Sequence, residues 1–460
     1  MVDEIIEPIV HHRLGRMFET ARNSPLVSGS FVSMSARVVG MIVAFGSHIL
    51  LSRVLGPTAY GSYVIALGWA LVFAIFARLG LDNAVLRFAT IYREEGQASE
   101  FRGLKRLSLG LILAVSMGLA LCLLIAKLLN AAWLEAVPPA MLLWVATLVA
   151  ALACLGWYSA LIRTAHRILA AQAYEQILRP ALLVVAVGVV ALAGITLTSS
   201  GAMMLTFAAT LAALVGIALH SRKYFSQLRH GPVTFHDRNA WLSMGWMLML
   251  MSLFQEAMNQ IEIILLGVLA SATDAAHFSA AARLASFVPF GLVAIVTVSA
   301  PIIASAYRRG DQVELAHVAK IAARFAFLFA MGVTVVLALI GQSALAAFGP
   351  TFVQAYPALM ILLVGGLVNA FTGAVAYMLS MTVHQKAALV IVSVAMLISG
   401  VANLLLIPRF GIVGSAMAST AAVCFWNLAM LVVVRRRLGV DSSAIGLAPS
   451  RGQAMGNSKS

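Results

Sequence analysis

Charged residues are scarce in this 460-residue sequence. Asp, Glu, Lys and Arg make up 10% of it, against about 25% in an average soluble domain. Apolar residues make up 62%, and the mean hydropathy is +0.96. So little polar surface cannot cover a water-soluble globule, and disorder would require low hydrophobicity with high charge. The composition therefore predicts a polytopic membrane protein.

Cysteines and catalytic motifs are also few. The three cysteines, Cys122, Cys154 and Cys424, lie in apolar runs and form neither a disulfide framework nor a zinc spacing, so we interpret them as small buried residues. The G-x-x-x-x-G-K-[ST] motif of ATP-driven pumps and the H-E-x-x-H motif of zinc enzymes do not occur. Loops of at most about 20 residues leave no room for a soluble catalytic domain. We therefore expect no cofactor and no metal.

Apolar runs of roughly 20 residues, long enough to cross a bilayer core of about 30 Å, occur twelve times. They predict an all-α fold with two six-helix lobes, at residues 26–220 and 240–434. An arm at 1–25 precedes the first lobe, a loop at 221–239 joins the lobes, and a tail at 435–460 follows. The expected spans are 28–52, 62–86, 106–128, 139–162, 178–199, 201–220, 240–268, 276–306, 320–342, 356–382, 388–407 and 411–434.

Basic residues are distributed unequally between the two sides of the membrane. One set of loops, with both terminal segments, carries 25 Lys and Arg residues, whereas the opposite loops carry Arg53 and Arg409. The larger set includes Arg179, at the start of the fifth expected span. By the positive-inside rule, the basic loops and both termini are cytoplasmic. The net charge of +14 thus reflects topology, and no nucleic-acid partner is needed to explain it.

The two expected lobes share a weak internal repeat. An Ala-x-x-Tyr-Arg motif that ends at Arg93, after the second span, recurs at Arg308, after the eighth, with an offset of 215 residues. Tyr63 and Phe278 share that offset, and a third pair of segments differs by 214. A nearly constant offset predicts two lobes in parallel orientation, because six helices return the chain to the same side. Such repeats usually enclose a binding site near the membrane midplane.

Arginines occur inside the expected spans, where a charged side chain is costly and usually faces a cavity or a partner. Arg37 and His48 share a strip of small and polar residues on the first helix, which suits the wall of a cavity. Arg78 and Asp82 are spaced i,i+4 and can pair. Arg37 and Arg283 have no acidic residue within one turn, so a structural ion pair explains them less well than ligand binding does.

The seventh expected span is the most polar. Five hydrogen-bonding residues share one arc of this helix: Gln255, Glu256, Asn259, Gln260 and Glu262. They cannot face lipid without a cost of several kcal/mol each. Together with Asp82 and His48, they are candidates for a polar cavity that couples transport to a gradient of H⁺ or Na⁺. The glutamates are the favoured proton carriers, because Arg78, one turn away, keeps Asp82 ionised.

Structural interpretations of these residues remain open. Arg78 and Asp82 can form an ion pair that allows both charges to be buried. The polar arc of the seventh span can hold neighbouring helices together through hydrogen bonds. The spacing of the residues is compatible with either interpretation.

Four segments resemble the Wzx-type polysaccharide flippases of the multidrug/oligosaccharidyl-lipid/polysaccharide (MOP) superfamily. They are residues 51–63 (LSRVLGPTAYGSY), 80–88 (GLDNAVLRF), 307–311 (YRRGD) and 406–416 (LIPRFGIVGSA). Each motif is loose, but their order and spacing make the match specific, and the resemblance covers nearly the whole chain.

The resemblance implies two six-helix bundles in a V shape that open alternately to the two sides of the membrane. Members of the family move undecaprenyl-diphosphate-linked oligosaccharides from the cytoplasmic to the periplasmic leaflet. Related lipid II flippases line a cationic cavity with arginines of the first, second and eighth helices. Arg37, Arg78 and Arg283 occupy those helices here, so the resemblance implies that they bind the substrate.

We therefore expect a flippase of the inner membrane rather than an enzyme. Its expected partners are the lipid-linked glycan, the bilayer, and the polysaccharide polymerase and chain-length machinery. A cation-coupled multidrug exporter of the same superfamily is the first alternative, which the acidic seventh helix favours and the buried arginines oppose. A membrane glycosyltransferase or polymerase is the second, and it would require polar groups gathered at one face of the membrane.

Overall fold

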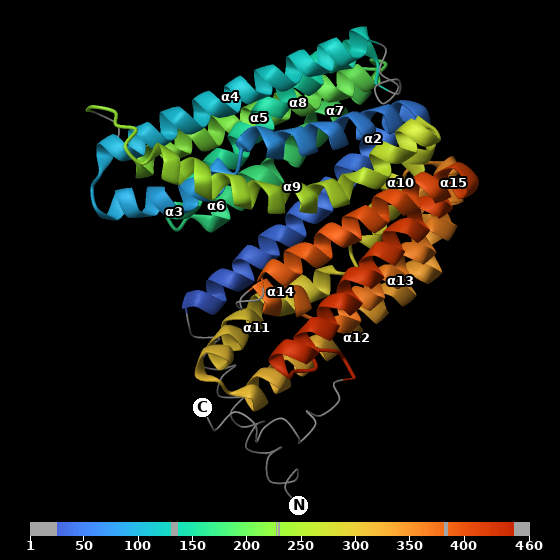
Figure 1. The fold of residues 1–460 in the computed structure, drawn as a ribbon. Coiled ribbons are helices and arrows are strands. Elements are labelled where there is room, and N and C mark those ends of the chain that lie inside the picture. Colours follow the sequence, from blue (N-terminus) through green and yellow to red (C-terminus); the bar gives the residue numbers. More distant parts are fainter. Residues whose placement is uncertain (1–24, 130–136, 227, 229–230, 381–384, 446–460) are drawn as a thin grey trace, which may run out of the picture.

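The computed structural model describes residues 25–129, 137–226, 228, 231–380 and 385–445. All the regular structure in these residues is helical, as expected. Residues 1–24 of the expected arm and 446–460 of the expected tail lie outside them. Figure 1 shows two bundles of helices that converge at one end and spread apart at the other, which is the expected V shape.

Each bundle forms one lobe. The N-lobe contains α2 (Pro25–Arg78), α3 (Leu81–Glu94), α4 (Ala98–Leu128), α5 (Pro139–Thr164), α6 (Ile168–Gln172), the π-helix η2 (Ala173–Leu178), α7 (Arg179–Leu192) and α8 (Ser199–Tyr224). The C-lobe contains α9 (Arg238–Leu269), α10 (Ala272–Ala285), α11 (Phe290–Arg309), α12 (Gln312–Ala346), the 3₁₀-helix η3 (Pro350–Ala355), α13 (Tyr356–Thr372), α14 (Val375–Ser380) and α15 (Gln385–Leu438).

The two longest helices are each long enough to cross the membrane twice. α2 and α15 have 54 residues each, or about 80 Å of helix at 1.5 Å per residue, far more than a bilayer core of about 30 Å. Each is interrupted by a glycine with positive φ, Gly56 at +74° and Gly411 at +54°. Figure 1 shows the blue chain of α2 turning back. Nine long apolar helices are present in the described residues, and these two reversals together with α9 bring the spans to the expected twelve.

The fifth span differs from its expected position. Its helix runs from Ile168 to Leu192 through α6, η2 and α7, whereas the apolar run predicted residues 178–199. The apolar run missed the first turns because they carry Gln172 and Glu175. The assignment of Arg179 to a cytoplasmic loop was therefore wrong. Arg179 lies eleven residues into the helix, about 16 Å from its start.

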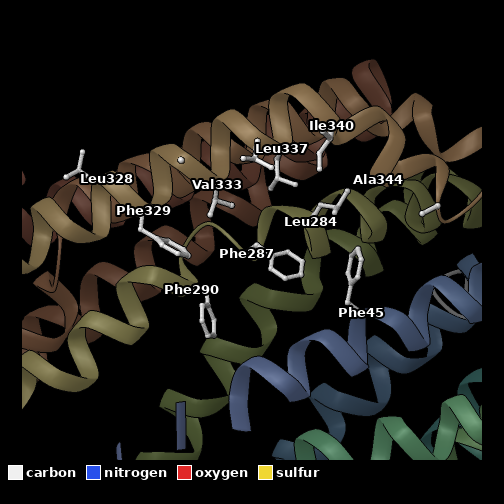
Figure 2. Close-up of a pocket in the computed structure, with 13 residues that line it drawn as sticks. Phe45, Leu284, Phe287, Phe290, Leu328, Phe329, Val333, Leu337, Ile340 and Ala344 are labelled. Atoms are coloured by element: carbon white, nitrogen blue, oxygen red, sulfur yellow. The ribbon is translucent and has the colours of Figure 1, made fainter. Parts of the chain in front are cut away.

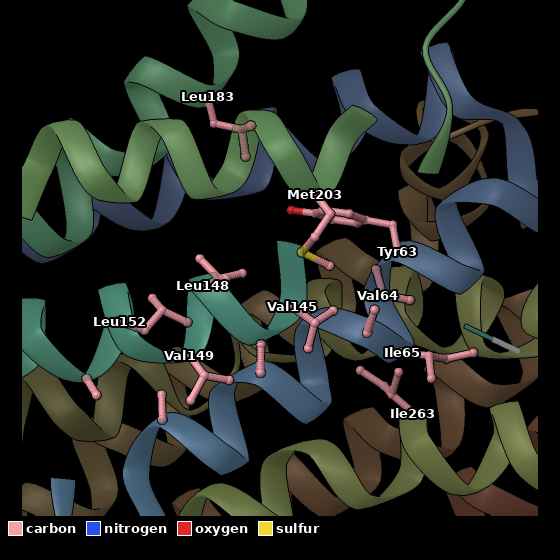
Figure 3. Packing of buried hydrophobic residues seen from close by; sticks show 14 of the residues in the cluster. Tyr63, Val64, Ile65, Val145, Leu148, Val149, Leu152, Leu183, Met203 and Ile263 are labelled. Atoms are coloured by element: carbon pink, nitrogen blue, oxygen red, sulfur yellow. The ribbon is translucent and has the colours of Figure 1, made fainter. Parts of the chain in front are cut away.

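The core of the N-lobe is built around α5, which is the most deeply buried of the long apolar helices in the described residues. Figure 3 shows Leu148 of α5 packed among Tyr63 of α2, Leu183 of α7 and Met203 of α8. Ile263 of α9 belongs to the same hydrophobic cluster. The first helix of the C-lobe therefore also packs against the N-lobe.

The start of α9 is fixed to the N-lobe by a second set of contacts. Tyr92 of α3 donates a hydrogen bond to Asp237 Oδ2 at 2.7 Å and accepts one from Trp241 Nε1 at 2.9 Å. Burial and the bond to Asp237 raise the pKa of Tyr92, so the phenol remains a donor. Gly80 has φ +69° and contacts Gly245 so closely that a Cβ atom at Gly80 would clash with its carbonyl. We call this side of the membrane, where α2 begins and α15 ends, the terminal side.

The lobes meet on the opposite, distal side, along a line of contacts that we call the distal seam. Arg53 donates hydrogen bonds from Nε to the carbonyl oxygen of Ala347 at 2.7 Å and from Nη2 to that of Ala346 at 2.6 Å. The hydroxyls of Thr58 and Thr273 lie 3.1 Å apart, and these residues are separated by 215 positions, the offset of the repeat. Equivalent residues that touch each other mark the axis between two related units. The lobes therefore touch on the distal side, and their helices spread apart toward the terminal side.

Candidate functional site

Five polar residues lie on helices α2, α7 and α10, which pack against one another, and we call them the cationic cluster. They are His48, Tyr60, Tyr63, Arg179 and Arg283. His48 Nδ1 lies 3.2 Å from the hydroxyl of Tyr60, and the Tyr63 hydroxyl lies 3.0 Å from Thr206 Oγ1. The charges of Arg179 and Arg283 both act on His48 and on Tyr63. The cluster thus combines one guanidinium group from each lobe.

Arg283 is the contribution of the C-lobe. It lies eleven residues beyond the start of α10, about 16 Å along the helix and therefore deep in the membrane. Its Nε is buried and has no hydrogen-bond partner within the described part of the chain. A buried donor without a partner is costly, so its persistence favours a ligand that supplies the acceptor.

Arg179 is the contribution of the N-lobe, and the sequence reasoning missed it. The carboxylate that acts on it is Glu175, one turn earlier, but Glu175 forms an ion pair with Arg163 at 3.2 Å. Arg179 itself forms no ion pair within the described residues. The signal that could have identified it is the spacing of Gln172, Glu175 and Arg179, which places three polar residues on one stripe of a helix.

Arg37 lies on α2 eleven residues before His48, about 16 Å along the helix from the cationic cluster. Arg37 is exposed. When the Gln172 amide is oriented so that its nitrogen donates to Ser33, its oxygen accepts a hydrogen bond from Arg37 Nε at 3.2 Å. A Cβ atom at Gly40 would lie 2.7 Å from the carbonyl oxygen of Gln176, so α2 packs directly on the π-helix η2. π-helical turns inside α-helices are frequent at functional sites.

Arg78 and Asp82 form the ion pair that their spacing predicted, with Nη1 and Oδ2 3.1 Å apart. The pair lies where the second span is interrupted, since Leu79 and Gly80 both have positive φ between α2 and α3. The guanidinium group covers Gly156 of α5, so this pair is part of the packing inside the N-lobe. No interaction in the described residues joins it to the cationic cluster.

Glu262 of α9 belongs to a buried polar network with α15. Its carboxylate lies near the hydroxyl groups of Ser399 and Ser419, and the residue is 6% exposed. Asn403 donates to Ser399 Oγ at 3.3 Å and accepts from Ser415 at 2.9 Å. We call these five residues the acidic network. It brings together a carboxylate and four neutral oxygen-bearing side chains, which are the ligands that hard cations prefer.

The other polar residues of α9 lie in different surroundings. Gln260 donates to Glu256 Oε1 at 2.9 Å, and its amide lies against Gly68 of α2. Gln255 and Asn259 are exposed. The five residues that share one arc in the sequence therefore divide between a contact with α15, a contact with α2 and an exposed strip.

Comparisons with known proteins agree with this architecture. The model of a family described as polysaccharide biosynthesis protein matches residues 26–307. The sequence matches none of the curated proteins with which it was compared. A solved structure described as lipid II flippase MurJ, in an inward closed conformation, is similar over 88% of this chain and 87% of its own, with a TM-score of 0.71 and 12% identity.

Two solved structures of MATE family multidrug transporters of the MOP superfamily are similar as well. The inward-facing one has a TM-score of 0.68 at 17% identity and covers 89% of this chain and 98% of its own. The outward-facing one has a TM-score of 0.57 at 15% identity and covers 90% and 95%. Identities this low establish the fold, while the family model covers more than half of the sequence. The chain therefore belongs to the polysaccharide biosynthesis protein family, with the fold of the MOP superfamily, which confirms the resemblance to Wzx-type flippases.

Proposed function

We propose that this protein moves undecaprenyl-diphosphate-linked oligosaccharides from the cytoplasmic to the periplasmic leaflet. The observation that carries the proposal is the cationic cluster, in which Arg179 and Arg283 approach from different lobes without a bound carboxylate in the described residues. A diphosphate offers several anionic acceptor oxygens, and guanidinium groups bind such acceptors through several donors at once. A headgroup bound here would connect the two lobes.

The orientation of the chain fits uptake from the cytoplasmic leaflet. With Arg179 removed from the loops, 24 basic residues remain on the terminal side against two on the distal side. By the positive-inside rule, this distribution supports cytoplasmic termini, and the inner membrane is the location we propose. Because the helices of the two lobes spread apart toward the terminal side, we expect substrate to enter from the cytoplasm.

Arg37 and Arg78 lie outside the cationic cluster and would have different roles. Arg37, exposed on α2 between the terminal side and His48, would attract the anionic headgroup before it reaches the cationic cluster. Arg78 would support the N-lobe through its pair with Asp82 rather than touch the substrate. The periplasmic product would pass to polysaccharide polymerase and chain-length machinery.

We assign the coupling of transport to the acidic network. Binding of H⁺ or Na⁺ at Glu262 would neutralise a buried carboxylate at the contact between α9 and α15. Because α9 also packs on the N-lobe, a change at this contact can alter how the lobes sit relative to each other. Glu256, bonded to Gln260 on another side of α9, is the second candidate.

A cation-coupled multidrug exporter is the alternative that a specific observation favours. A buried carboxylate such as Glu262 suits a cationic drug or its coupling ion. Two guanidinium groups without a bound carboxylate in the cluster would repel a cationic drug at mid-membrane depth, where charges interact strongly. We therefore favour the anionic substrate.

The test is transport by the purified protein in proteoliposomes that contain an undecaprenyl-diphosphate-linked oligosaccharide. We expect wild-type protein to expose the glycan to an enzyme on the opposite side, and Arg283→Ala to reduce that exposure roughly a hundredfold at an unchanged protein level. Arg283→Lys should recover part of it, because a point charge replaces several donors. Full activity of both Arg37→Ala and Arg283→Ala would refute the cationic site, and drug export by the wild type would favour the alternative.

A further inference from the structure

An apolar groove lies between α2 of the N-lobe and α10, α11 and α12 of the C-lobe. Its volume is about 650 Å³, within the usual range of about 300–1,000 Å³ for small-molecule sites. All its lining residues are apolar. Figure 2 shows Phe45 of α2, Phe287 and Phe290 at the break between α10 and α11, and Phe329 of α12 around this space.

The groove lies directly beside the cationic cluster. Leu284, which lines it, follows Arg283 in the chain, and Phe287 lies one turn beyond Arg283. On α2, Phe45 precedes His48 by three residues, and its ring lies 5.4 Å from that of Phe287. The helices that hold the charged cluster therefore also line the apolar groove.

The side of the groove formed by α12 opens toward the bilayer. Leu328 is 66% exposed, Val336 51% and Ile340 52%, although α12 is one of the apolar membrane-spanning helices. Apolar side chains exposed on such a helix face lipid. The groove thus provides an apolar path between the bilayer and the neighbourhood of Arg283.

We propose that this groove holds the polyprenyl chain of the substrate while its diphosphate lies at Arg283, a proposal that rests on the proposed function. A headgroup bound at mid-depth inside the protein leaves its chain to reach the bilayer sideways, because exposing the chain to a polar space costs about 25 cal/mol per Å² of apolar surface. An anionic group attached to a long apolar chain matches a guanidinium group beside an apolar groove. An ordinary phospholipid that fills the groove would have no link to Arg283.

Gly332 of α12 offers a direct way to fill the groove. It lines the groove, and a Cβ atom at this position would meet no atom within 4 Å, so a larger side chain can be added without a clash at its base. Gly118 of α4 is a matched control, because it is an exposed glycine in a membrane-spanning helix with the same open space and lies outside the groove.

The experiment measures binding of two probes, undecaprenyl diphosphate and inorganic diphosphate, to the full chain in nanodiscs. We expect Gly332→Ala, Gly332→Leu and Gly332→Phe to weaken undecaprenyl diphosphate progressively, by about tenfold or more for Phe, without change for inorganic diphosphate. Gly118→Phe should leave both affinities unchanged. Melting temperatures equal to wild type would show that the variants fold.

Three outcomes separate the possibilities. Unchanged binding of undecaprenyl diphosphate in Gly332→Phe overturns the groove as the chain site, even if Arg283→Ala weakens both probes as the proposed function requires. Loss of co-purified phospholipid in Gly332→Phe, with undecaprenyl diphosphate binding unchanged, assigns the groove to membrane lipid and also overturns it. A wild-type protein that binds neither probe refutes the proposed function together with the inference.

Discussion

The N-lobe and the C-lobe place different side chains at equivalent positions of their repeat. With the offset of 215 residues, Arg283 of the C-lobe corresponds to Gly68 of the N-lobe, and His48 of the N-lobe corresponds to Ile263 of the C-lobe. Gly68 provides space for Gln260 of α9, whereas Arg283 contributes a charge to the cluster. The repeat thus preserves the course of the backbone, and the candidate site depends on where the two lobes differ.

The lobes are alike where they touch. The contact between Thr58 and Thr273 joins equivalent residues on the axis, and Gly61 approaches Ala272 so closely that a Cβ atom at Gly61 would clash. Close contact between backbones favours small residues on both sides. A seam of this kind can separate and re-form without rearrangement inside either lobe, which alternating access requires.

Locking the distal seam should have the largest effect. With the native cysteines replaced by serine, Thr58→Cys combined with Thr273→Cys should form a disulfide on oxidation, since the two hydroxyls lie 3.1 Å apart. We expect transport to stop completely and to return on reduction, because the lobes must part here. Each single variant serves as the control. Normal transport by the cross-linked protein would show that the lobes do not separate at this seam.

Removing one arginine from either lobe should be the next largest effect. Loss of hydrogen bonds to a charged group costs about 3 kcal/mol, so Arg179→Ala and Arg283→Ala should each reduce transport roughly a hundredfold. The proteoliposome assay measures this, and Arg167→Ala, which removes the basic residue just before α6 of the same span, is the control. If only one of these two substitutions reduces transport strongly, the headgroup is not held by both lobes.

The acidic network should affect coupling more than transport itself. Glu262→Gln should reduce the stimulation of transport by an imposed H⁺ or Na⁺ gradient, at clamped potential, by about tenfold, the equivalent of 1.4 kcal/mol. Glu256→Gln on the same helix tests the second candidate. If the response to both gradients is unchanged in Glu262→Gln and in the double variant, the drive comes from membrane potential or product removal.

Arg53 should shift the equilibrium between the state in which the lobes touch at the distal seam and the state in which they are separated there. Arg53→Ala removes two hydrogen bonds to carbonyls at the end of α12, each worth about 0.5–1.5 kcal/mol. We expect the single cysteine of Thr58→Cys to react a few times faster with a membrane-impermeant maleimide in this background. An unchanged labelling rate would show that Arg53 does not hold the seam.

The Arg78–Asp82 pair should have the smallest effect on transport. Replacing both residues, with Arg78→Leu and Asp82→Leu, should keep transport within about twofold of wild type, whereas Asp82→Ala alone should lower the melting temperature by leaving a partly buried charge unpaired. Differential scanning fluorimetry and the transport assay report the two properties separately. If a stable double variant loses transport, Arg78 contributes to substrate binding, as the resemblance implies.

The sequence by itself determined the class, the twelve spans, the repeat and the Arg78–Asp82 pair. These follow from composition, from apolar runs as long as the bilayer is thick, and from helical spacing, all of which are local properties. Resemblance to the flippases supplied the V shape and placed Arg37 and Arg283 in plausible helices. The same local reasoning misplaced Arg179, because polar residues in the first turns of the fifth span look like a loop.

Only the tertiary structure decided which polar residues meet. His48, Arg179 and Arg283 lie on three helices of two lobes, and no spacing along the chain links them. The polar arc of α9 divides because α2 and α15 pack on different sides of that helix, so Glu262 acquires partners from residues more than 130 positions away. Helix packing fixes these neighbours, since burial of a charge becomes tolerable only when distant parts of the chain supply its partners.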